Sequence, residues 1–240
     1  MNTAPAPILI AGFPLGSSAG LVTAFEWLGQ PYRITRVDML GEMRTDAYKR
    51  LNGRVETPVL ITENGHVVTE TMAIAAWLEA RDSERRISFA PGTPQADRMH
   101  QYLAFLNTSF TGAFYPLWVA LEAQDATEDE KATLRKFGRE FVALRHQQLE
   151  TMMGDSDYLL GSAPTLADAV FAGVARWADF HQAVDPQDYP RILALRRRIE
   201  ADAAFRFALA IEDGKPEIGS GAMRGLVPLE SVLRSAGALN

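Results

Sequence analysis

The sequence predicts a small mixed α/β domain followed by an all-helical domain. Strand and helix patterns alternate through residues 1–82 and include two strands that read as a hairpin. From residue 95 onward the pattern is helical, and no stretch alternates like a strand. The segment RDSERRISFAPGTPQAD (81–97) is polar and contains two prolines, as is typical of a linker. We therefore expect two domains, residues 1–82 and residues 95–240.

The first half of the α/β domain predicts two strands and two helices. PILIAGF (7–13) is a short apolar strand, and SSAGLVTAFEWLGQ (17–30) is a helix that begins at serine and closes at Gly29. YRITRVDM (32–39) alternates like a strand. A polar segment containing DAYKRLNGR (46–54) follows, for which we expect a short helix and a loop.

The second half, ETPVLITENGHVVTETMAIAAWLEARD (56–82), predicts a hairpin and a helix. The Asn64-Gly65 dipeptide between two apolar runs favours a two-residue hairpin turn. Because the first crossover requires parallel strands and the hairpin an antiparallel pair, we expect a mixed sheet. Pro58 opens the first hairpin strand, although proline cannot donate to a sheet ladder. On the residues alone, it fits a trans proline on an edge strand equally well.

The second domain is predicted to consist of long helices. From residue 97, apolar side chains recur at steps of three or four and indicate one long helix. These positions are Met99, Tyr102, Leu103, Leu106, Phe110, Ala113, Phe114, Leu117 and Leu121. Further helices are expected over residues 128–152, 165–181 and 190–212, and Thr165 with Asp168 reads as a capping box.

Composition and charge argue against several classes of function. The chain has no cysteine, which excludes disulfides, thiolate metal sites and Cys-x-x-C redox chemistry, and its four histidines lack metal-binding spacing. The net charge of −6 argues against a nucleic-acid partner, and the arginines at 196–198 read as a solvated helix face. We expect no transmembrane segment and no secretory signal, and therefore a cytoplasmic location.

Three stretches resemble one known family. TPVL…ENG…VVTETMAIAAWLEAR (57–81) is similar to its Val-Pro-x-Leu … Glu-Ser-x-Ala-Ile-x-x-Tyr-Leu pattern. YLLGSAPTLADAVFAG (158–173) resembles a helix cap of its helical domain, and PLGSSAGLVTAFEWLGQPY (14–32) resembles the first loop and helix of bacterial members. On these motifs the chain is identified as a member of the cytosolic glutathione S-transferase family. The resemblance implies a thioredoxin-like first domain, glutathione as co-substrate, no metal, and a homodimer.

The resemblance also implies roles for four residues. Pro58 is expected to be cis, so that the backbone of Thr57 pairs with the cysteinyl backbone of glutathione. The γ-glutamyl carboxylate is expected at the Thr71 hydroxyl and N–H, because a helix N-terminus favours an anion. The ammonium group is expected at Glu70. Without the resemblance, Glu70 and Thr71 read as an ordinary helix cap with an acidic neighbour.

The loop before Pro58 departs from the family pattern. Members often read Asn-Pro-x-Gly-Lys-Val-Pro, whereas this chain reads NGRVETP (52–58). Glu56 stands in place of a lysine that reaches the glycyl carboxylate of glutathione, and its charge would repel that group. Arg54 is the residue that could compensate.

Ser17 and Ser18 are the candidates for activating the thiol of glutathione. The thiolate is the nucleophile, and lowering a thiol pKa by ~2 units requires ~2.7 kcal/mol. One hydroxyl hydrogen bond to a charged acceptor supplies ~1.5–3 kcal/mol. Ser17 matches the place of the cysteine in beta-type bacterial members and is preferred over Ser18, while one of the two serines is expected to be the helix N-cap. The remaining alternative is activation by backbone N–H groups or by neither serine. Thr111 stands where beta-type members carry a histidine, so we expect a related but distinct bacterial type.

The resemblance places the electrophile between the two domains. Candidates for an apolar wall are Phe13, Phe110, Phe114, Tyr115 and Trp118, although aromatic residues at helical spacing usually belong to a core. A segment over residues 223–233 is expected to close the site. The expected function is a glutathione S-transferase acting on an apolar electrophile. The alternatives are a glutathione-binding or protein-interaction module without catalysis, and a glutathione-dependent isomerase or lyase.

Overall fold

The structure, a computed structural model, describes residues 6–215 and 218–239. It divides into two compact units, residues 1–88 together with 201–240, and residues 89–200. The C-terminal residues were expected in the helical domain, but they group with the first unit because they add a strand and two helices to it. No helix in the described part of the chain is long and apolar enough to span a membrane.

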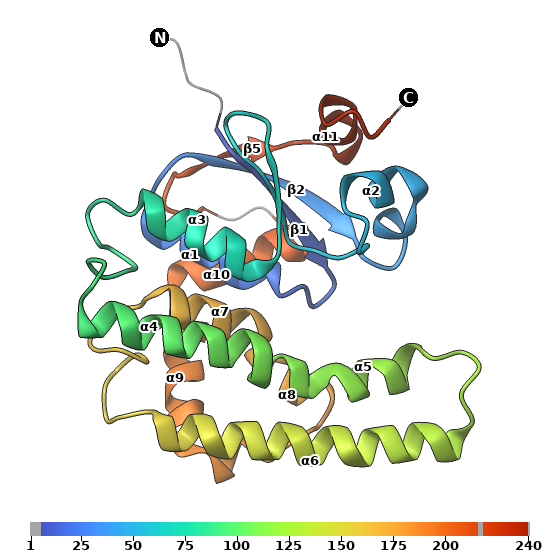
Figure 1. The fold of residues 1–240 in the computed structure, drawn as a ribbon, viewed down its shortest axis with the longest axis vertical. Coiled ribbons are helices and arrows are strands. Elements are labelled where there is room, and N and C mark those ends of the chain that lie inside the picture. Colours follow the sequence, from blue (N-terminus) through green and yellow to red (C-terminus); the bar gives the residue numbers. More distant parts are fainter. Residues whose placement is uncertain (1–5, 216–217, 240) are drawn as a thin grey trace. The chain divides into compact units, whose positions relative to one another are not determined.

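The first unit contains the mixed sheet that the sequence predicts. Its strands are β1 (Ile8–Phe13), β2 (Tyr32–Asp38), β3 (Val59–Ile61), β4 (Val67–Thr69) and β5 (Met223–Leu226). They are ordered β4-β3-β1-β2-β5. Figure 1 labels three of them, β1, β2 and β5. β1 runs parallel to β2 and antiparallel to β3, and β3 pairs with β4 as the predicted hairpin. The parallel pairing of β5 with β2 was not predicted.

Helices cover both sides of this sheet. They are α1 (Ser18–Leu28), α2 (Asp46–Leu51), α3 (Thr71–Arg81), α10 (Ala203–Glu212) and α11 (Leu229–Ser235), with a 3-10 turn at Glu42–Arg44. α1 packs against β1, α3 and α10, whereas α11 packs against β2 and α2 (Figure 1). α1 ends at Gly29, whose φ of +73° is a conformation that glycine adopts without strain.

The C-terminal segment is held to the first unit by buried polar groups. Glu26, itself buried, accepts hydrogen bonds from the Tyr32 hydroxyl and the Ser220 N–H, both at 2.6 Å. The Thr35 hydroxyl donates to the Val227 carbonyl at 2.9 Å. A cluster of buried apolar residues then joins α11 to α2 and the sheet: Ile10, Val37, Tyr48, Leu51, Val59, Val227, Val232, Leu233 and Ala238.

The named elements of the second unit are all helices or helical turns, and its described residues also form one isolated β-bridge, between Tyr158 and Gly161. It contains α4 (Pro94–Ala104), a π-helical turn (Phe105–Phe110), a 3-10 turn (Gly112–Phe114), α5 (Tyr115–Glu122), α6 (Glu128–Met152), α7 (Leu166–Ala175), α8 (Trp177–Phe180), a 3-10 turn (Pro186–Asp188) and α9 (Pro190–Ala201). The single long helix predicted from residue 97 is therefore interrupted in its middle. The helix predicted over 165–181 is divided at Arg176, and the one over 190–212 at Asp202.

Asp202 divides its helix because it caps the next one. Its carboxylate accepts the N–H groups of Ala204 and Phe205, at 2.8 and 3.3 Å, as well as the indole N–H of Trp27 at 3.0 Å. A side chain that satisfies the first N–H groups of α10 favours a helix start at this position. Apolar periodicity continues through it, which is why the sequence predicted one helix here.

Candidate functional site

The register of three strands brings the expected glutathione-binding residues to one end of the sheet. Ile10 faces Val59 across β1 and β3, so the same register two residues further places Gly12 opposite Thr57. Val59 faces Thr69 across β3 and β4, which places the start of α3 beside Thr57 on its other side. A Cβ at Gly12 would lie 2.3 Å from the Thr57 hydroxyl oxygen, so any larger residue there would require the Thr57 side chain to move.

Thr57 and Pro58 have the backbone that the resemblance implies. The Thr57–Pro58 peptide bond is cis, and Pro58 is buried. Neither the N–H nor the C=O of Thr57 takes part in a backbone hydrogen bond with another described residue. The hydroxyl of Thr57 makes only a weak contact with the sulfur of Met39, at 3.4 Å. The backbone of Thr57 is thus available to an extended ligand.

Glu70 and Thr71 form the other side of this sheet end. Glu70 has φ +73° and ψ 126°, a conformation that costs a non-glycine residue of order 1–3 kcal/mol and is concentrated at functional sites. Its carboxylate is exposed and lies 3.3 Å from the guanidinium of Arg54. Thr71 begins α3, whose N-terminus has no side-chain cap. Its first N–H groups are therefore suited to an anionic ligand.

The loop from Asn52 to Thr57 is held from within the unit. The hydroxyl of Tyr48 and the side-chain amide of Asn52 both donate to the Glu56 carbonyl, each at 2.8 Å. Burial, and to a lesser degree the negative charge of Glu56, raise the pKa of Tyr48 well above its usual value, so this hydroxyl remains a donor. Val55 has φ +57°, and this left-handed conformation turns the chain between Asn52 and Glu56. Sequence reasoning missed both Tyr48 and Asn52 because their partner is a backbone carbonyl.

Arg54 neutralises the charge of Glu56. Its Nε lies 2.8 Å from one carboxylate oxygen of Glu56 and its Nη2 lies 3.2 Å from the other. The hydrogen bond and charge of Glu56, followed by the charge of Glu70, raise the pKa of the Arg54 guanidinium. The Arg54 side chain is 64% exposed, so water screens these pairs and each contributes little to stability. Arg54 is thus placed beside both acidic residues of the site.

The two adjacent serines have different surroundings. Ser18 is 1% exposed, and its hydroxyl oxygen accepts the Gly12 N–H at 3.0 Å. This bond joins the start of α1 to the end of β1. Ser17 is half-buried at the N-terminus of α1, and its hydroxyl makes no hydrogen bond within the described residues. Ser18 is therefore engaged in the fold, while the hydroxyl of Ser17 is available to a ligand.

The loop before Ser17 contains features that the sequence did not predict. The Phe13–Pro14 peptide bond is also cis, and Leu15 has φ +58°. The Leu15 N–H donates to the carboxylate of Glu212 in α10, and the Arg36 guanidinium lies 4.2 Å from the centre of the Phe13 ring. Glu212 and Arg36 were missed because no local pattern links them to this loop.

Two of the expected wall residues are core residues. Phe110 and Phe114 are fully buried; the Phe110 ring contacts Phe171, and the Phe114 ring contacts Trp177. As placed in this structure, they therefore fill the helical core and do not line an open surface, which corrects that expectation. The physical reason is that large aromatic side chains at helical spacing are the ones that a helix buries.

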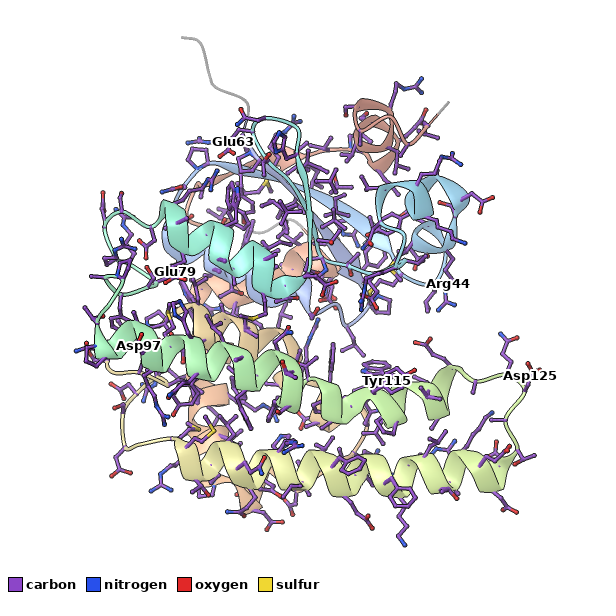
Figure 2. The ribbon with its side chains drawn as sticks, in the orientation of Figure 1. Arg44, Glu63, Glu79, Asp97, Tyr115 and Asp125 are labelled. Atoms are coloured by element: carbon purple, nitrogen blue, oxygen red, sulfur yellow. The ribbon has the colours of Figure 1, made fainter. Side chains whose placement is uncertain are left out.

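The other three wall residues have separate environments. Phe13 belongs to the first unit and is half-buried beneath Arg36. Tyr115 is exposed at the start of α5, where Figure 2 shows it. Trp118 stacks on Phe180 and meets Trp177 edge-on. These three remain candidates for contact with an apolar ligand.

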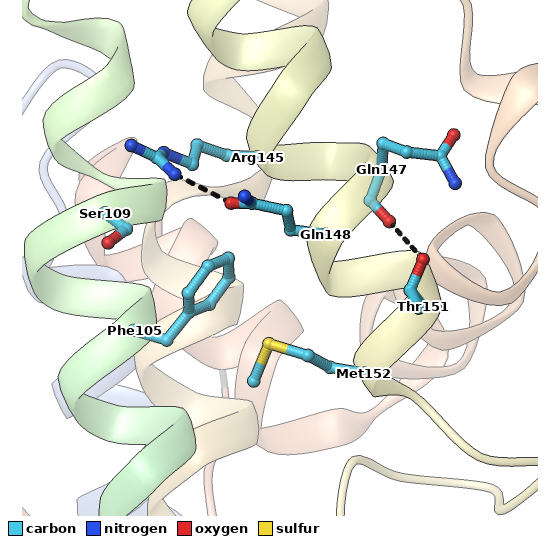
Figure 3. A pocket seen from close by; sticks show the side chains of 7 residues that line it. All are labelled: Phe105, Ser109, Arg145, Gln147, Gln148, Thr151 and Met152. Atoms are coloured by element: carbon cyan, nitrogen blue, oxygen red, sulfur yellow. Dashed lines mark hydrogen bonds between the residues drawn. The ribbon is translucent and has the colours of Figure 1, made fainter.

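A separate groove lies in the second unit, between the π-helical turn and α6. It has a volume of about 480 Å³, and Figure 3 shows its lining: Phe105, Ser109, Arg145, Gln147, Gln148, Thr151 and Met152. Arg145 donates to the Gln148 side chain at 2.7 Å, so its charge is partly engaged. None of the expected site residues lines this groove. Across the described residues, no group of three or more histidine, aspartate or glutamate side chains is arranged to hold a metal ion.

Comparison with known proteins gives matches in both units. Residues 18–81 match the family described as Glutathione S-transferase, N-terminal domain, and residues 147–198 match Glutathione S-transferase, C-terminal domain. The Uncharacterized GST-like protein YncG of Escherichia coli K12 is 30% identical over 162 residues, which are 63% of this chain and 73% of that protein. Glutathione S-transferase GstA of Escherichia coli O157:H7 is 23% identical over 77% of this chain and 88% of its own.

A third relative bears a different name. Elongation factor 1-gamma of Schizosaccharomyces pombe is 32% identical over 114 residues, which are 48% of this chain. The match spans only 27% of the length of that protein.

Solved structures show the same fold. A glutathione S-transferase from Xylella fastidiosa has a TM-score of 0.77 at 21% identity, covering 88% of this chain and 100% of its own. A glutathione transferase homologue from Sulfitobacter, with bound glutathione, has a TM-score of 0.75 at 23% identity, covering 88% and 98%.

Proposed function

This chain belongs to the glutathione S-transferase family, and from that premise we propose that it is a glutathione transferase that activates the thiol of bound glutathione for attack on an apolar electrophile. One observation carries the proposal. At the end of the sheet lie the Thr57 backbone, the start of α3 and, beyond Gly12, the hydroxyl of Ser17, and none of these has a hydrogen-bond partner or side-chain cap among the described residues. Peptide, anion and thiol recognition would therefore meet in one place.

The charges of the site complement those of glutathione, which carries two carboxylates and one ammonium group. Thr71 and the N–H groups of α3 would take the γ-glutamyl carboxylate, and Glu70 would take the ammonium group. Arg54 would take the glycyl carboxylate in place of the lysine that is missing from this loop. Its pairing with Glu56 supports this assignment, because the guanidinium offsets the carboxylate that would otherwise repel the ligand.

Ser17 would stabilise the thiolate by donating its O–H to the sulfur. A hydroxyl hydrogen bond to an anion contributes ~1.5–3 kcal/mol, which corresponds to a lowering of the thiol pKa by about 1 to 2 units. The start of α1 adds a smaller favourable potential of ~0.3–1 kcal/mol. The engagement of Ser18 with Gly12 supports Ser17 over Ser18 for this role.

We also propose that the enzyme is distinct from the beta type. Ser17 and Thr111 stand where that type carries a cysteine and a histidine. The Thr111 hydroxyl donates to the Leu106 carbonyl at 2.8 Å, which is a bond to the π-helical turn that Thr111 caps. With no cysteine in the chain, a mixed disulfide between protein and glutathione cannot form.

Substitution of Ser17 tests the proposed function. Ser17→Ala should lower kcat with an apolar aryl halide by about tenfold or more, because it removes a hydrogen bond that strengthens with charge on sulfur. The KM for glutathione should change little, because Thr57, Glu70 and Thr71 remain. An unchanged kcat in this variant would remove Ser17 from the mechanism.

A protein-interaction module is the second candidate function. The observation that favours it is the 32% identity with elongation factor 1-gamma over nearly half of this chain. The name of that relative denotes no transferase. Such a module would have no turnover for Ser17→Ala to reduce. Saturable glutathione binding without turnover on any aryl halide or epoxide tested would favour this candidate over the enzyme.

A further inference from the structure

The loop that leads into Ser17 has a conformation that its own residues do not favour. Leu15 has φ +58°, in the left-handed region that a leucine rarely occupies because its Cβ crowds the backbone. Gly16 follows it, and a Cβ there would lie 2.1 Å from the Gly12 carbonyl oxygen. The loop is therefore folded tightly onto the end of β1, with Leu15 at its turning point.

Glu212, at the last position of α10, contacts this turning point. The Leu15 N–H donates to one oxygen of the Glu212 carboxylate at 2.7 Å. Hydrogen bonds to a charged acceptor are short and about twice as strong as neutral ones. Because the bond is made to the amide of Leu15, it holds the peptide plane and hence the φ of this residue.

A second contact joins Glu212 to the other side of the loop. The main-chain carbonyl of Glu212 accepts Nη2 of Arg36 at 2.8 Å, and the same guanidinium lies over the ring of Phe13. Glu212 is therefore linked to Leu15 through its side chain and to Phe13 through Arg36. The two contacts lie on either side of Pro14.

α10 holds Glu212 in a fixed place. The helix packs against α1 and β1, and the free space among Gly12, Phe13, Ser18, Arg36 and Glu212 is only about 10 Å³. That is no more than one water molecule requires. A carboxylate at the end of a closely packed helix therefore offers the Leu15 amide an acceptor whose position is fixed.

We propose that Glu212 is a positioning residue that fixes Leu15 in its left-handed conformation and so aims the hydroxyl of Ser17 at the sulfur of glutathione. This inference rests on the proposed function, because it concerns the same reaction. Ser17 follows Leu15 by two residues, so a turn of the Leu15 peptide redirects the start of α1. Glu212 itself does not touch the reacting atoms.

Two substitutions of Glu212 and one control test the proposal. Glu212→Ala removes the acceptor, and Glu212→Gln keeps an oxygen at the same place without the charge. Glu230→Ala is the control, because it removes another carboxylate from the C-terminal segment whose partner is the exposed side chain of Arg234. Hydrogen exchange of the Leu15 amide, followed by NMR without glutathione, reports on the loop alone. Steady-state kinetics with glutathione and an aryl halide report on its consequence.

The expected results separate positioning from mere stability. In Glu212→Ala the Leu15 amide should exchange about tenfold faster or more, and kcat should fall about tenfold with little change in the KM for glutathione. Glu212→Gln should lie between this variant and the unmodified protein in both measurements. Glu230→Ala should leave both unchanged.

Other outcomes would overturn the proposal. Unchanged exchange at Leu15 in folded Glu212→Ala would show that another contact sets the loop. Faster exchange with unchanged kcat would show that the loop does not aim Ser17. If Glu212→Ala does not fold, Glu212→Gln decides in the same way, since normal exchange and kcat in it would refute a role for the charged acceptor. Turnover that is absent even from the unmodified protein would refute the proposed function, and that result is distinct from any effect of Glu212.

Discussion

At the scale of residues, Ser17 and Ser18 carry the same hydroxyl in different surroundings. The Ser18 oxygen accepts the buried N–H of Gly12, whereas the Ser17 hydroxyl faces no acceptor or donor of the described chain. Surroundings also matter for Glu56, which stands where the family pattern has a lysine. Arg54 balances the charge of Glu56. The proposed chemistry at this sheet end would use the polar groups that have no partner among the described residues.

This contrast predicts unequal effects of two alanine substitutions on stability. Ser18→Ala leaves the Gly12 N–H buried without an acceptor and should lower the free energy of unfolding by about 1–3 kcal/mol. Ser17→Ala removes no hydrogen bond among the described residues and should change the free energy of unfolding by less than about 0.5 kcal/mol. Urea unfolding without glutathione compares the two variants. Equal losses in both would show that Ser17 is part of the fold.

His146 predicts a pH dependence of stability. Burial lowers its pKa from the ordinary 6.5 to about 4, although its bond to the Val142 carbonyl opposes this. The unfolded chain therefore binds a proton between these values that the folded chain does not, so stability present above pH 6.5 is lost as the pH falls toward 4. The full loss is about 3 kcal/mol.

Substitution of His146 isolates this contribution. His146→Leu cannot titrate, so the difference in unfolding free energy between it and the unmodified protein should shift by about 3 kcal/mol across that range. Asp168 titrates in the opposite sense, because burial raises its pKa to about 6, but it is present in both proteins and cancels. Parallel pH profiles for the two proteins would refute a buried neutral His146.

At the scale of elements, the C-terminal segment completes the first unit, which carries the candidate glutathione site. β5 pairs with the outer edge of β2. α11 packs against α2, which leads into the loop from Asn52 to Thr57. Arg50 of α2 also donates to the Ala238 carbonyl at 2.8 Å. That this segment closes the electrophile site stays a prediction; in the described structure it packs against α2 and so supports the loop that carries Arg54.

The burial of Leu233 predicts how strongly α11 supports this loop through α2. Its side chain is 5% exposed in the cluster that joins α11 to α2, so Leu233→Ala should cost about 2–5 kcal/mol. Amide exchange in residues 45–57 should become faster. Leu226→Ala is the matched control, because this leucine of β5 is 54% exposed and its loss should cost little. Equal effects of both substitutions would refute support of this loop by α11.

The elements that the sequence predicted are those with a strong local signal. The hairpin of β3 and β4 follows from Asn64-Gly65 between two apolar runs, and α3 follows directly after it. β5 has no such signal, since Met-Arg-Gly-Leu is short, does not alternate and contains a glycine at φ +111°. Its strand conformation comes from pairing with β2, almost two hundred residues away, which no local pattern encodes.

The candidate site was predictable to a similar extent. Thr57, Pro58, Glu70 and Thr71 stand in a motif, and the structure brings them to one sheet end. The choice between Ser17 and Ser18 needed the position of the Gly12 N–H. Glu212 was beyond prediction, because it acts on a backbone amide from the far end of the chain.

At the scale of the whole molecule, a homodimer remains a prediction with a surface on which it can be tested. Phe137, Phe141 and Leu144 lie on one stripe of α6 and are 47–49% exposed. Phe141→Glu places a charge in this stripe and should convert a dimer into a monomer in sedimentation velocity. Leu40→Glu changes an exposed apolar residue in the other unit and should not. A monomeric unmodified protein would refute the dimer.

Activation of the glutathione thiol is tested most directly by an ultraviolet difference titration of the protein with glutathione. The titration runs from about pH 5 to about pH 9 and records thiolate absorbance. The proposed enzyme should ionise the bound thiol about 1 to 2 units below its free pKa near 8.5, and Ser17→Ala should bind glutathione but lose most of that shift. Saturable binding with no shift of the thiol pKa, in a protein whose Ser17 is intact, would contradict thiol activation. Absence of binding would contradict the site itself.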